Sequence, residues 1–356
     1  MSETQLLEIS PNHPVETEGG VERVVLEIIK NLSDEFSTDV LCTGSGSRDI
    51  DGGRVYSIST PSYMKQLFFN ILQVAFLLRN RKRYDTIHVH GSNGAAAILL
   101  SYTGLIDAKT VLTLHGLTVA SGIDTKEHYV SHLLQKTSIR YADKTVSVSK
   151  GVKQEVESHY GFEDIDVIYN GVDTENFRPI DQEEARKKLD LPLEKDIVLW
   201  VGLEKRRKNF DLVLDVVREL DNAILVSTVV EDDSELYHRV GKLKYEEMNY
   251  LYNSADVFLF PSKYEAASLV LLEAMAAGTP IVCSRASKPE LIEHGEDGFI
   301  VDSWETEDYL YKVRAFLDKE NKISDIANRA RRKAEDFSWK DQTERYENLF
   351  LSLQKQ

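Results

Sequence analysis

The sequence predicts an α/β protein built from two doubly wound, Rossmann-like domains that face each other. At 356 residues, the chain is long enough for two domains that each bury a core of their own. Short apolar runs alternate with longer helical patterns, which is typical of βαβ units with a mostly parallel sheet. The alternation occurs in two series, separated by the polar stretch Asp173–Gln182, which contains Pro179.

Seven short apolar runs make up the first series of expected strands. They span Leu6–Ile9, Val40–Cys42, Val55–Ile58, Ile87–His90, Val111–Leu114, Val146–Val148 and Val167–Ile168. Between the first two runs, apolar side chains recur at helical spacing and predict a helix with one buried face. These side chains are Val21, Val24, Val25, Ile28, Ile29 and Leu32. The first series therefore predicts an N-terminal domain of residues 1–179.

The second series predicts a C-terminal domain of residues 180–337. Its expected strands are Ile197–Val201, Ala223–Val226, Val257–Phe260, Ile281–Cys283 and Phe299–Val301. The last segment, residues 338–356, has the pattern of a helix with an apolar face formed by Trp339, Tyr346, Leu349, Phe350 and Leu353, following Phe337. Since the second domain is complete without it, we expect this helix to cross back to the N-terminal domain. Ligands of such sheets bind at the carboxyl ends of the strands.

The composition is that of a globular protein without a nucleic-acid surface. The formal net charge of -16 would repel phosphate backbones, so we expect no nucleic-acid partner, and an anionic ligand must meet a local basic site. Cys42 and Cys283 each lie in an apolar run, which predicts buried thiols and a reducing compartment. The sequence has neither a signal-peptide pattern nor an apolar stretch long enough to span a membrane, so we expect a cytoplasmic location.

The segment that follows the apolar run Val257–Phe260 carries the strongest functional signal. Glu265 lies in the expected loop, and Glu273 lies on a helix that begins near Ser268. Carboxylates accept hydrogen bonds from the paired hydroxyls of a sugar or ribose, and a helix N-terminus offers backbone N–H groups to phosphate. The alternative interpretation is a chance pairing of two solvated carboxylates.

A basic run, Lys205–Lys208, follows the expected strand Ile197–Val201. Lys208 opens the expected helix Phe210–Leu220, where a point charge adds to the positive end of the helix dipole. We interpret Lys208 as a diphosphate ligand in a chain of negative net charge. The alternative is a solvated basic loop.

Glycine and histidine mark three further places in the N-terminal domain. Gly19 and Gly20 precede the first helix and allow close backbone approach, which suits a donor phosphate, an acceptor or a plain tight turn. His115 closes a strand, so its ring or its carbonyl can face a reacting carbon. His88 and His90 alternate on one strand, and we interpret them as core or rim residues.

The sequence does not predict a metal site or a dinucleotide site. The acidic segments Asp49–Asp51 and Glu231–Asp233 fall in polar stretches, so we interpret both as solvated acid rather than as metal ligands. No G-x-G-x-x-G pattern follows a strand, which disfavours a dehydrogenase. We therefore expect neither a metal nor another cofactor.

The expected helix Met64–Arg83 allows two interpretations. Its apolar side chains, placed inside in our assignment, are Leu67, Phe68, Ile71, Leu72, Val74, Ala75, Leu77 and Leu78, and its basic end has Arg79, Arg81, Lys82 and Arg83. One interpretation is a buried crossover helix with a charged end. The other is peripheral contact with an anionic membrane, which would present the active site to a lipid-linked acceptor.

Taken together, these motifs resemble the large family of retaining glycosyltransferases with the GT-B fold and the E-x7-E signature, which includes sucrose, mannosyl and glycogen synthases. The resemblance covers nearly the whole chain. The matching segments are Gly19–Gly20, Thr113–Gly116, Ser147–Ser149, Tyr169–Asp173 with Phe177 and Pro179, Glu265–Glu273, and Pro289–Leu291 with Gly295 and Gly298.

The resemblance implies a role for each matching residue. Glu273 should hold the ribose hydroxyls of a nucleotide, and Glu265 should lie beside the donor sugar. Backbone N–H groups should reach the donor from Ala266, Ala267, Ser268 and Leu269. The family match also favours a place at the reacting carbon for His115. From their own positions in the chain, we expect Lys208 to face the diphosphate and Gly20 to approach the donor.

The chain departs from the family at two points. Ala266 and Ala267 stand where relatives have glycine or serine and then phenylalanine. Leu203 stands where relatives have an arginine, and Arg206 or Arg207 is the candidate to replace it.

The predicted function is transfer of a hexose-type sugar, with retention and without metal, from a UDP- or GDP-linked donor to a glycan or lipid-linked acceptor. The N-terminal domain would bind the acceptor and the C-terminal domain the donor. A nucleotide-sugar epimerase of the same fold is a rival. A catalytically weak sugar-binding or scaffolding homologue is another, suggested by Leu203 and Ala267.

Overall fold

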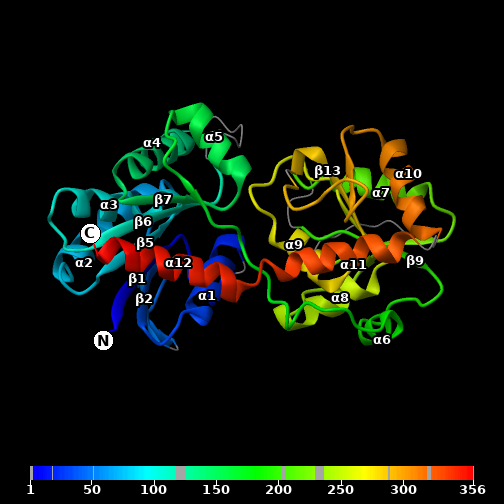
Figure 1. Ribbon diagram of the computed structural model, residues 1–356, viewed down its shortest axis with the longest axis horizontal. Helices are drawn as coiled ribbons and strands as arrows, with labels where there is room; N and C mark the ends of the chain where they lie inside the picture. The colour runs from blue at the N-terminus through cyan, green and yellow to red at the C-terminus, as the bar shows by residue number, and fades with distance from the viewer. Residues whose placement is uncertain are drawn as a thin grey trace. The chain divides into compact units, whose positions relative to one another are not determined.

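The computed structural model describes residues 3–17, 19–50, 52–117, 126–202, 206–228, 236–287, 289–318 and 322–355. The chain divides into two compact units, each an α/β sandwich with its own sheet (Figure 1). Unit 1 comprises Met1–Asn170 and Trp339–Gln356, and unit 2 comprises Gly171–Ser338. The predicted α/β class is therefore confirmed.

Within the described residues, the sheet of unit 1 has eight strands in the order β3-β4-β2-β1-β5-β6-β7-β8. All neighbouring strands are parallel except β3 and β4, which form an antiparallel pair. The strands are β1 Thr4–Ser10, β2 Phe36–Thr43, β3 Arg48–Ile50, β4 Gly53–Ile58, β5 Thr86–His90, β6 Lys109–Leu114, β7 Lys144–Ser147 and β8 Asp166–Val167. The order along the sheet reverses between β1 and β5, which makes this the topological switch point of unit 1.

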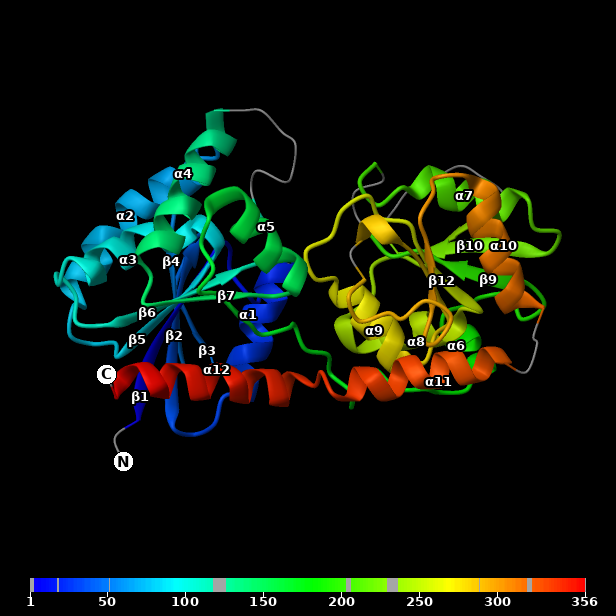
Figure 2. The same cartoon turned by 45° about the horizontal axis from the view of Figure 1, so that its top comes forward.

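Helices cover both faces of this sheet (Figure 2). They are α1 Gly20–Asn31, α2 Lys65–Arg79, α3 Ala95–Tyr102, α4 Lys126–Tyr141, α5 Lys150–Tyr160 and α12 Trp339–Gln354, with a 3-10 turn at Gly91–Gly94. Helices α2, α3 and α4 contact one another on one face, and α1 contacts α12 on the other. The predicted first helix is confirmed, with Val24, Val25 and Ile28 fully or almost fully buried.

The C-terminal helix α12 returns to unit 1, as the sequence predicted. Phe350 packs edge-on against Phe36 of β2, with ring centroids 6.1 Å apart. Tyr346 lies 5.1 Å from the ring of His88 on β5. The same apolar face that identified the helix in the sequence thus completes the core of unit 1.

The sequence interpretation of α2 was correct in burying Leu77 but wrong for at least half of the apolar side chains that it placed inside. Phe68, Ile71, Leu72 and Leu78 are between 37% and 56% exposed, whereas the inward face carries two amides. Asn70 donates to the carbonyl of Ser92, and Gln73 donates to the carbonyl of Asn93. The inward face therefore combines the apolar Phe69 and Leu77 with two amides that satisfy the backbone of the turn after β5, and periodicity alone cannot report this requirement.

Unit 2 has a parallel sheet in the order β11-β10-β9-β12-β13-β14 over the described residues. The strands are β9 Asp196–Leu199, β10 Ala223–Ser227, β11 Tyr237–Arg239, β12 Val257–Phe260, β13 Ile281–Ser284 and β14 Phe299–Val301. The helices are α6 Gln182–Lys188, α7 Phe210–Arg218, α8 Met248–Ser254, α9 Leu269–Ala277, α10 Thr306–Leu317 and α11 Lys322–Glu335, with 3-10 turns at Tyr245–Glu247 and Arg285–Ser287. The order reverses between β9 and β12, which is the switch point of unit 2.

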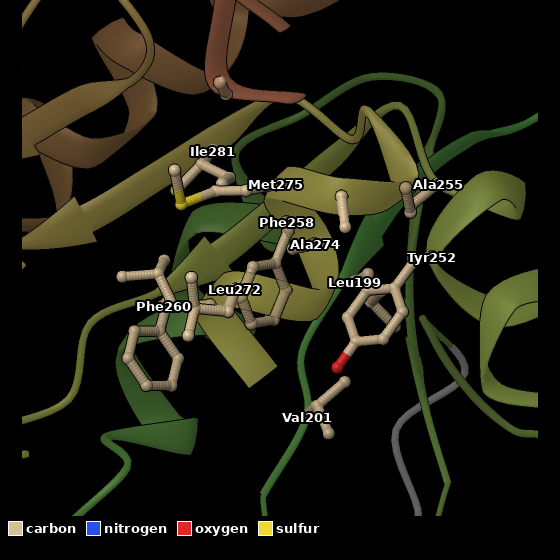
Figure 3. Packing of buried hydrophobic residues seen from close by; sticks show 14 of the residues in the cluster. Leu199, Val201, Tyr252, Ala255, Phe258, Phe260, Leu272, Ala274, Met275 and Ile281 are labelled. Atoms are coloured by element: carbon tan, nitrogen blue, oxygen red, sulfur yellow. The ribbon is translucent and has the colours of Figure 1, made fainter. Parts of the chain in front are cut away.

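Both faces of the second sheet are buried, because strand side chains alternate between two apolar clusters. Phe258 and Phe260 of β12 point into one cluster with α8 and α9, where Tyr252 and Met275 also lie (Figure 3). Val257 and Leu259 belong to the other cluster, which packs against α7 and α10. The core holds β9 and β12 rigidly, so the loops at their carboxyl ends start from fixed points.

The short apolar runs in the sequence did not predict two of the strands, β3 and β11. Strand β3 contains Asp49, which the sequence placed in a polar loop; its side chain is nevertheless 86% exposed. Strand β11 forms the edge of the second sheet, in a stretch with few apolar residues. Asp51 and the segment Glu231–Asp233 lie outside the described residues.

Within the described part of the chain, no helix is both long enough and apolar enough to cross a bilayer. Cys42 and Cys283 are buried free thiols, one in each unit.

Candidate active site

The turn between β9 and α7 fixes the position of Lys208 through its backbone. Trp200 Nε1–H donates to the carbonyl of Lys208 at 3.1 Å. A Cβ on Gly202 would lie 2.9 Å from Lys208 Cγ and 3.0 Å from Trp200 Cζ2, so only glycine fits beside this turn. Lys208 lies in the turn before α7, whose N-cap is Asn209, rather than opening the helix as the sequence suggested.

Three of the predicted site residues meet at the carboxyl ends of β9 and β12. Glu265 Oε1 accepts a hydrogen bond from Lys208 Nζ at 2.7 Å and another from Arg207 Nη1 at 3.1 Å. Arg207 Nη1 also donates to the carbonyl of Tyr264 at 3.0 Å. The turn after β9 and the loop after β12 are further joined by Lys263 N–H, which donates to the carbonyl of Arg207. We call Arg207, Lys208 and Glu265 the basic cluster.

The basic cluster is a local positive site in a negatively charged protein. It contains two cations and one carboxylate, whereas the whole chain carries a formal net charge of -16. The side chains of Lys208 and Glu265 are 11% and 10% exposed, so solvent screens their interaction less than at a surface. Lys208 Nζ also lies 4.7 Å from the centroid of the Phe260 ring, a favourable cation–π distance.

Glu273 lies on the buried side of α9, where a phenol binds it. Tyr252 O–H donates to Glu273 Oε2 at 2.7 Å. Burial, together with the Glu273 carboxylate, raises the pKa of Tyr252 well above its usual range, so the phenol stays a donor. A carboxylate has about four acceptor positions, and one phenol occupies one of them.

Helix α9 begins at Leu269, and Ser268 is its N-cap residue. Helical geometry leaves the first backbone N–H groups without an intrahelical acceptor, and they point toward the carboxyl end of β12. Ala266 and Ala267 form the preceding loop between Glu265 and the helix. The predicted donor-contacting segment is therefore a helix N-terminus beside the basic cluster.

In unit 1, Gly19 and Gly20 differ in their surroundings. A Cβ on Gly19 would lie 1.9 Å from Glu22 Oε2, because Glu22 folds back over the N-cap. Glu22 Oε1 accepts from Asn12 Nδ2 at 2.6 Å. Among the described residues, no atom lies within 4 Å of a Cβ built on Gly20, so the first residue of α1 faces open space.

Beside the switch point of unit 1, a buried network joins one carboxylate to two histidines. Glu8 Oε1 lies 3.0 Å from His88 Nδ1, and Glu8 Oε2 lies 2.8 Å from His90 Nε2. Glu8 and His88 are paired residues of β1 and β5, and His90 lies two residues further on the same face. Sequence reasoning missed this network; the available signal was a glutamate inside an otherwise apolar strand, opposite an H-x-H pattern.

His115 joins this network at the end of β6. Its Nε2 lies 2.9 Å from His90 Nδ1, and the two rings stack with centroids 5.2 Å apart. Burial, followed by the charges of His90 and His88, lowers the pKa of His115 well below its usual range. The structure thus supports a neutral His115 at physiological pH, held by His90.

A second arm of the network runs to the C-terminal helix. His88 Nε2 lies 2.8 Å from Thr113 Oγ1, which lies 3.2 Å from the Tyr346 hydroxyl. Burial raises the pKa of Tyr346, so this hydroxyl remains protonated. Helix α12 therefore closes the network as well as the apolar core.

The same three buried residues have the spacing of metal ligands. Among the described residues, one atom each from Glu8, His88 and His90 lies within 4.8 Å of the others. Both carboxylate oxygens, however, already accept hydrogen bonds from imidazole nitrogens. The hydrogen bonds account for these residues without a cation.

The structure therefore brings together Arg207, Lys208 and Glu265, and places Ser268 and Leu269 at the neighbouring helix start. His115 and Gly20 belong to unit 1 and lie near its own switch point. Leu203, Lys205 and most of the segment from Leu117 to Glu127 lie outside the described residues.

Two doubly wound units and a C-terminal helix that returns to the first define the GT-B class of proteins. Solved structures agree with this fold. Sucrose-phosphate synthase of Thermosynechococcus elongatus superposes with a TM-score of 0.87 at 18% identity, covering 99% of each chain. A complex of Anabaena HepE with UDP and glucose superposes with a TM-score of 0.80 at 18% identity, covering 98% of this chain and 100% of that one.

Sequence profiles identify the family. The profile of Glycosyltransferase Family 4 matches residues 18–176, and that of Glycosyl transferases group 1 matches residues 181–333. The chain belongs to this family of glycosyltransferases.

Relatives with higher sequence identity match only part of the chain. The D-inositol 3-phosphate glycosyltransferase of Rhodococcus jostii (strain RHA1) is 28% identical over 259 residues, which are 65% of this chain and 57% of the relative. The sulfoquinovosyl transferase SQD2 of Arabidopsis thaliana is 32% identical over 193 residues, 50% of this chain and 38% of the relative. The matches thus span less than two thirds of either relative.

Proposed function

We propose that this protein transfers a hexose-type sugar from a nucleotide-sugar donor, bound by unit 2, to a saccharide or lipid-linked acceptor bound by unit 1. The observation that carries the proposal is the basic cluster at the switch point of unit 2. Ligands of doubly wound sheets bind at this point, and a diphosphate requires local positive charge in a chain whose formal net charge is -16. The solved complex of Anabaena HepE with UDP-glucose supports this choice of donor class.

Lys208 is proposed to stabilise the leaving diphosphate. As the bond between sugar and phosphate breaks, negative charge grows on the phosphate oxygen, and a cation that is already in place stabilises this charge without reorganisation. Glu265 holds Lys208 Nζ at 2.7 Å, which fixes the direction of the ammonium group. Arg207 supplies a second cation, in the role that the family's arginine would have at Leu203.

Glu273 is proposed to bind the ribose of the donor. Its carboxylate accepts from Tyr252 O–H, and carboxylate oxygens accept more than one hydrogen bond, as the paired hydroxyls of a ribose require. The N-terminal N–H groups of α9, after Ala266 and Ala267, are proposed to contact the donor sugar and diphosphate. Gly20 and His115 of unit 1 are proposed to contact the substrates.

Transfer is proposed to proceed with retention. The acceptor hydroxyl would attack the anomeric carbon from the face that the diphosphate leaves. Its proton would pass to the leaving phosphate oxygen, and the new glycosidic bond would form as the sugar–phosphate bond breaks. In this scheme, the protein's main task is electrostatic, and its fixed cations supply the positive charge that a metal supplies elsewhere.

A lipid-linked acceptor is favoured by the outer surface of unit 1. Helix α2 exposes Phe68, Ile71, Leu72 and Leu78, and its neighbours α3 and α4 expose Tyr102 and Tyr129. Arg79, Arg81 and Lys82 at the end of α2 are exposed as well. Arg83 donates to Asp39 and is therefore used inside the unit. An apolar surface beside basic residues is suited to an anionic membrane.

Vesicle binding tests the membrane part. We expect the protein to float with vesicles that contain anionic phospholipid at low salt. Replacing Arg79, Arg81 and Lys82 by glutamine should weaken binding about 100-fold, at roughly 1 kcal/mol per basic residue. If the protein does not bind anionic vesicles at low salt, the membrane proposal is wrong and the acceptor is expected to be a soluble saccharide.

Incubation with labelled UDP-, GDP- and ADP-sugars tests the function itself. We expect slow hydrolysis of one donor alone, and faster release of the nucleotide with an added acceptor extract. Isomerisation of the donor would identify the epimerase alternative. Binding without turnover would identify a sugar-binding homologue, and no binding of any nucleotide sugar would refute the proposal.

A further inference from the structure

The hydrogen bonds that end at Glu8 have only one consistent direction when Glu8 is ionised. A carboxylate only accepts, so His88 Nδ1 and His90 Nε2 must both carry a proton. A neutral His90 protonated at Nε2 has a bare Nδ1, which can only accept. The atom at 2.9 Å from this Nδ1 is His115 Nε2, which must therefore carry the proton of that bond.

The protonation states required by this assignment agree with the surroundings. Burial raises the pKa of Glu8, but the charge of His88 and hydrogen bonds from both histidines outweigh burial and bring it to about 2. Burial, followed by the charge of His88, lowers the pKa of His90. Glu8 is thus ionised and His90 neutral near pH 7.

We propose that His90, oriented by Glu8, is a positioning residue that holds His115 in the Nε2–H tautomer, so that His115 presents Nδ1 as an acceptor for a substrate hydroxyl. Within the described residues, Nδ1 of His115 has no hydrogen-bond partner. The proposed ligand is a sugar hydroxyl, which donates to the bare nitrogen. This inference rests on the proposed transferase function for its kinetic part only.

The free-energy cost of burying Glu8, His88 and His90 indicates that these residues have a role beyond packing in the core. A buried carboxylate with two buried imidazoles is expensive to desolvate, and apolar side chains of similar volume would stabilise a sheet at least as well. All three side chains have at most 1% exposure. A carboxylate that orients an imidazole and fixes its tautomer is the arrangement in which catalytic histidines are held in Ser-His-Asp triads, where the wrong tautomer costs about 10⁴ in rate. In this protein, the imidazole of His90 lies between the Glu8 carboxylate and the His115 ring that is proposed to bind substrate.

Two substitutions of His90 separate hydrogen bonding from packing. His90→Phe keeps an aromatic ring against His115 but offers no acceptor. His90→Asn loses ring volume, yet its amide oxygen replaces Nδ1 and accepts from His115. The matched control is Tyr346→Phe, which removes a buried hydroxyl from the other arm of the network.

Nitrogen-15 NMR of histidine-labelled protein reads the tautomer directly, with the His115 signals assigned from a His115→Gln sample. We expect His115 to be Nε2–H in the wild type, in His90→Asn and in Tyr346→Phe, and to populate Nδ1–H in His90→Phe. We expect kcat to fall about tenfold or more in His90→Phe, with the KM for the donor within about twofold, and to recover in part in His90→Asn.

Three results would overturn the proposal. They are an Nδ1–H tautomer of His115 in the wild type, an unchanged tautomer and kcat in His90→Phe, or equal losses of kcat in His90→Phe and Tyr346→Phe. If His90→Phe does not fold, the wild-type tautomer and His90→Asn still decide the question. If the wild type transfers no sugar, the proposed function fails, whereas the tautomer measurement remains valid because it needs no turnover.

Discussion

Both units have a cluster of polar side chains near the switch point of their sheet, but the two clusters differ in composition. Unit 1 has a carboxylate with histidines, and unit 2 has two cations with a carboxylate. In unit 1, the residues beside the switch point are Glu8, His88, His90 and His115, whose charges and tautomers depend on one another. In unit 2, they are Arg207, Lys208 and Glu265, held by ion pairs of 2.7 and 3.1 Å. The first set holds imidazole donors and acceptors in fixed directions around one buried carboxylate, and the second provides two cations paired with one carboxylate.

This difference fits a division of labour between the units. Hydroxyl groups of an acceptor are neutral and need directed hydrogen bonds, whereas a diphosphate needs positive charge. We therefore expect perturbations of the two units to have different signatures. Substitutions in unit 2 should change donor affinity and the transfer rate. Substitutions in the histidine network of unit 1 should change how the stability of that unit depends on pH.

The largest effect is expected for Lys208→Ala. Removing the cation proposed to stabilise the leaving phosphate should lower kcat by about 10²–10³, as does the loss of one group that stabilises a developing anion. Arg207 still pairs with Glu265, so the protein should remain folded. Steady-state rates should be compared with Lys187→Ala, which removes a surface lysine paired with Glu183. Similar rates in the two variants would exclude Lys208 from the reaction.

A smaller effect is expected for Glu273→Gln. The amide oxygen can still accept from Tyr252, so the buried phenol keeps its partner, but the charge proposed to bind the ribose hydroxyls is lost. Calorimetric titration should show nucleotide affinity weakened about tenfold, the equivalent of about 1.4 kcal/mol. Glu335→Gln on the exposed side of α11 is the control. Unchanged affinity in Glu273→Gln would remove Glu273 from the donor site.

As the pH falls below about 6.5, we expect unit 1 to lose folding stability because of its histidine network. The folded pKa values of His90 and His115 lie below the usual 6.5, so only the unfolded chain takes up these protons as the pH falls below about 6.5, and the unit loses stability. The contribution of Glu8, with a folded pKa of about 2 against 4.5, persists above pH 4.5 and is lost as the pH falls toward 2. Hydrogen exchange of β1 and β5 amides, corrected for intrinsic rates, should show this loss between pH 7 and 5. His90→Asn should reduce it, and an equal loss in wild type and variant would contradict the account.

No effect is expected from chelation. The positive charge at the proposed leaving group comes from Lys208 and Arg207, so EDTA should leave the transfer rate unchanged. Activity lost in EDTA and restored by Mn²⁺ or Mg²⁺ would contradict this prediction. The buried residues Glu8, His88 and His90 would then be the described cluster to test first.

The sequence predicted single elements well but missed contacts between residues that are distant in the chain. The α/β class and the returning helix α12 were predictable because apolar runs and a 3.6-residue period record burial directly. Glu265 and Lys208 were identified because each follows a predicted strand. Their ion pair was not, since it requires β9 and β12 to be neighbours in the sheet.

Sequence reasoning missed the network in unit 1 for a related reason. Glu8 and His88 are eighty residues apart and meet only because β1 and β5 pair in register. The exposed face of α2 was misjudged because Asn70 and Gln73 serve the backbone of a turn that lies far along the chain. In each case, the missing information was a partner that is distant in sequence.

The most direct test of the central claim is a crystal structure with the nucleotide sugar that gives the largest thermal shift. We predict density for the diphosphate within hydrogen-bonding distance of Lys208 Nζ, at the carboxyl ends of β9 and β12, with the ribose at Glu273. A nucleotide bound elsewhere, or one whose diphosphate contacts neither Lys208 nor Arg207, would contradict the account.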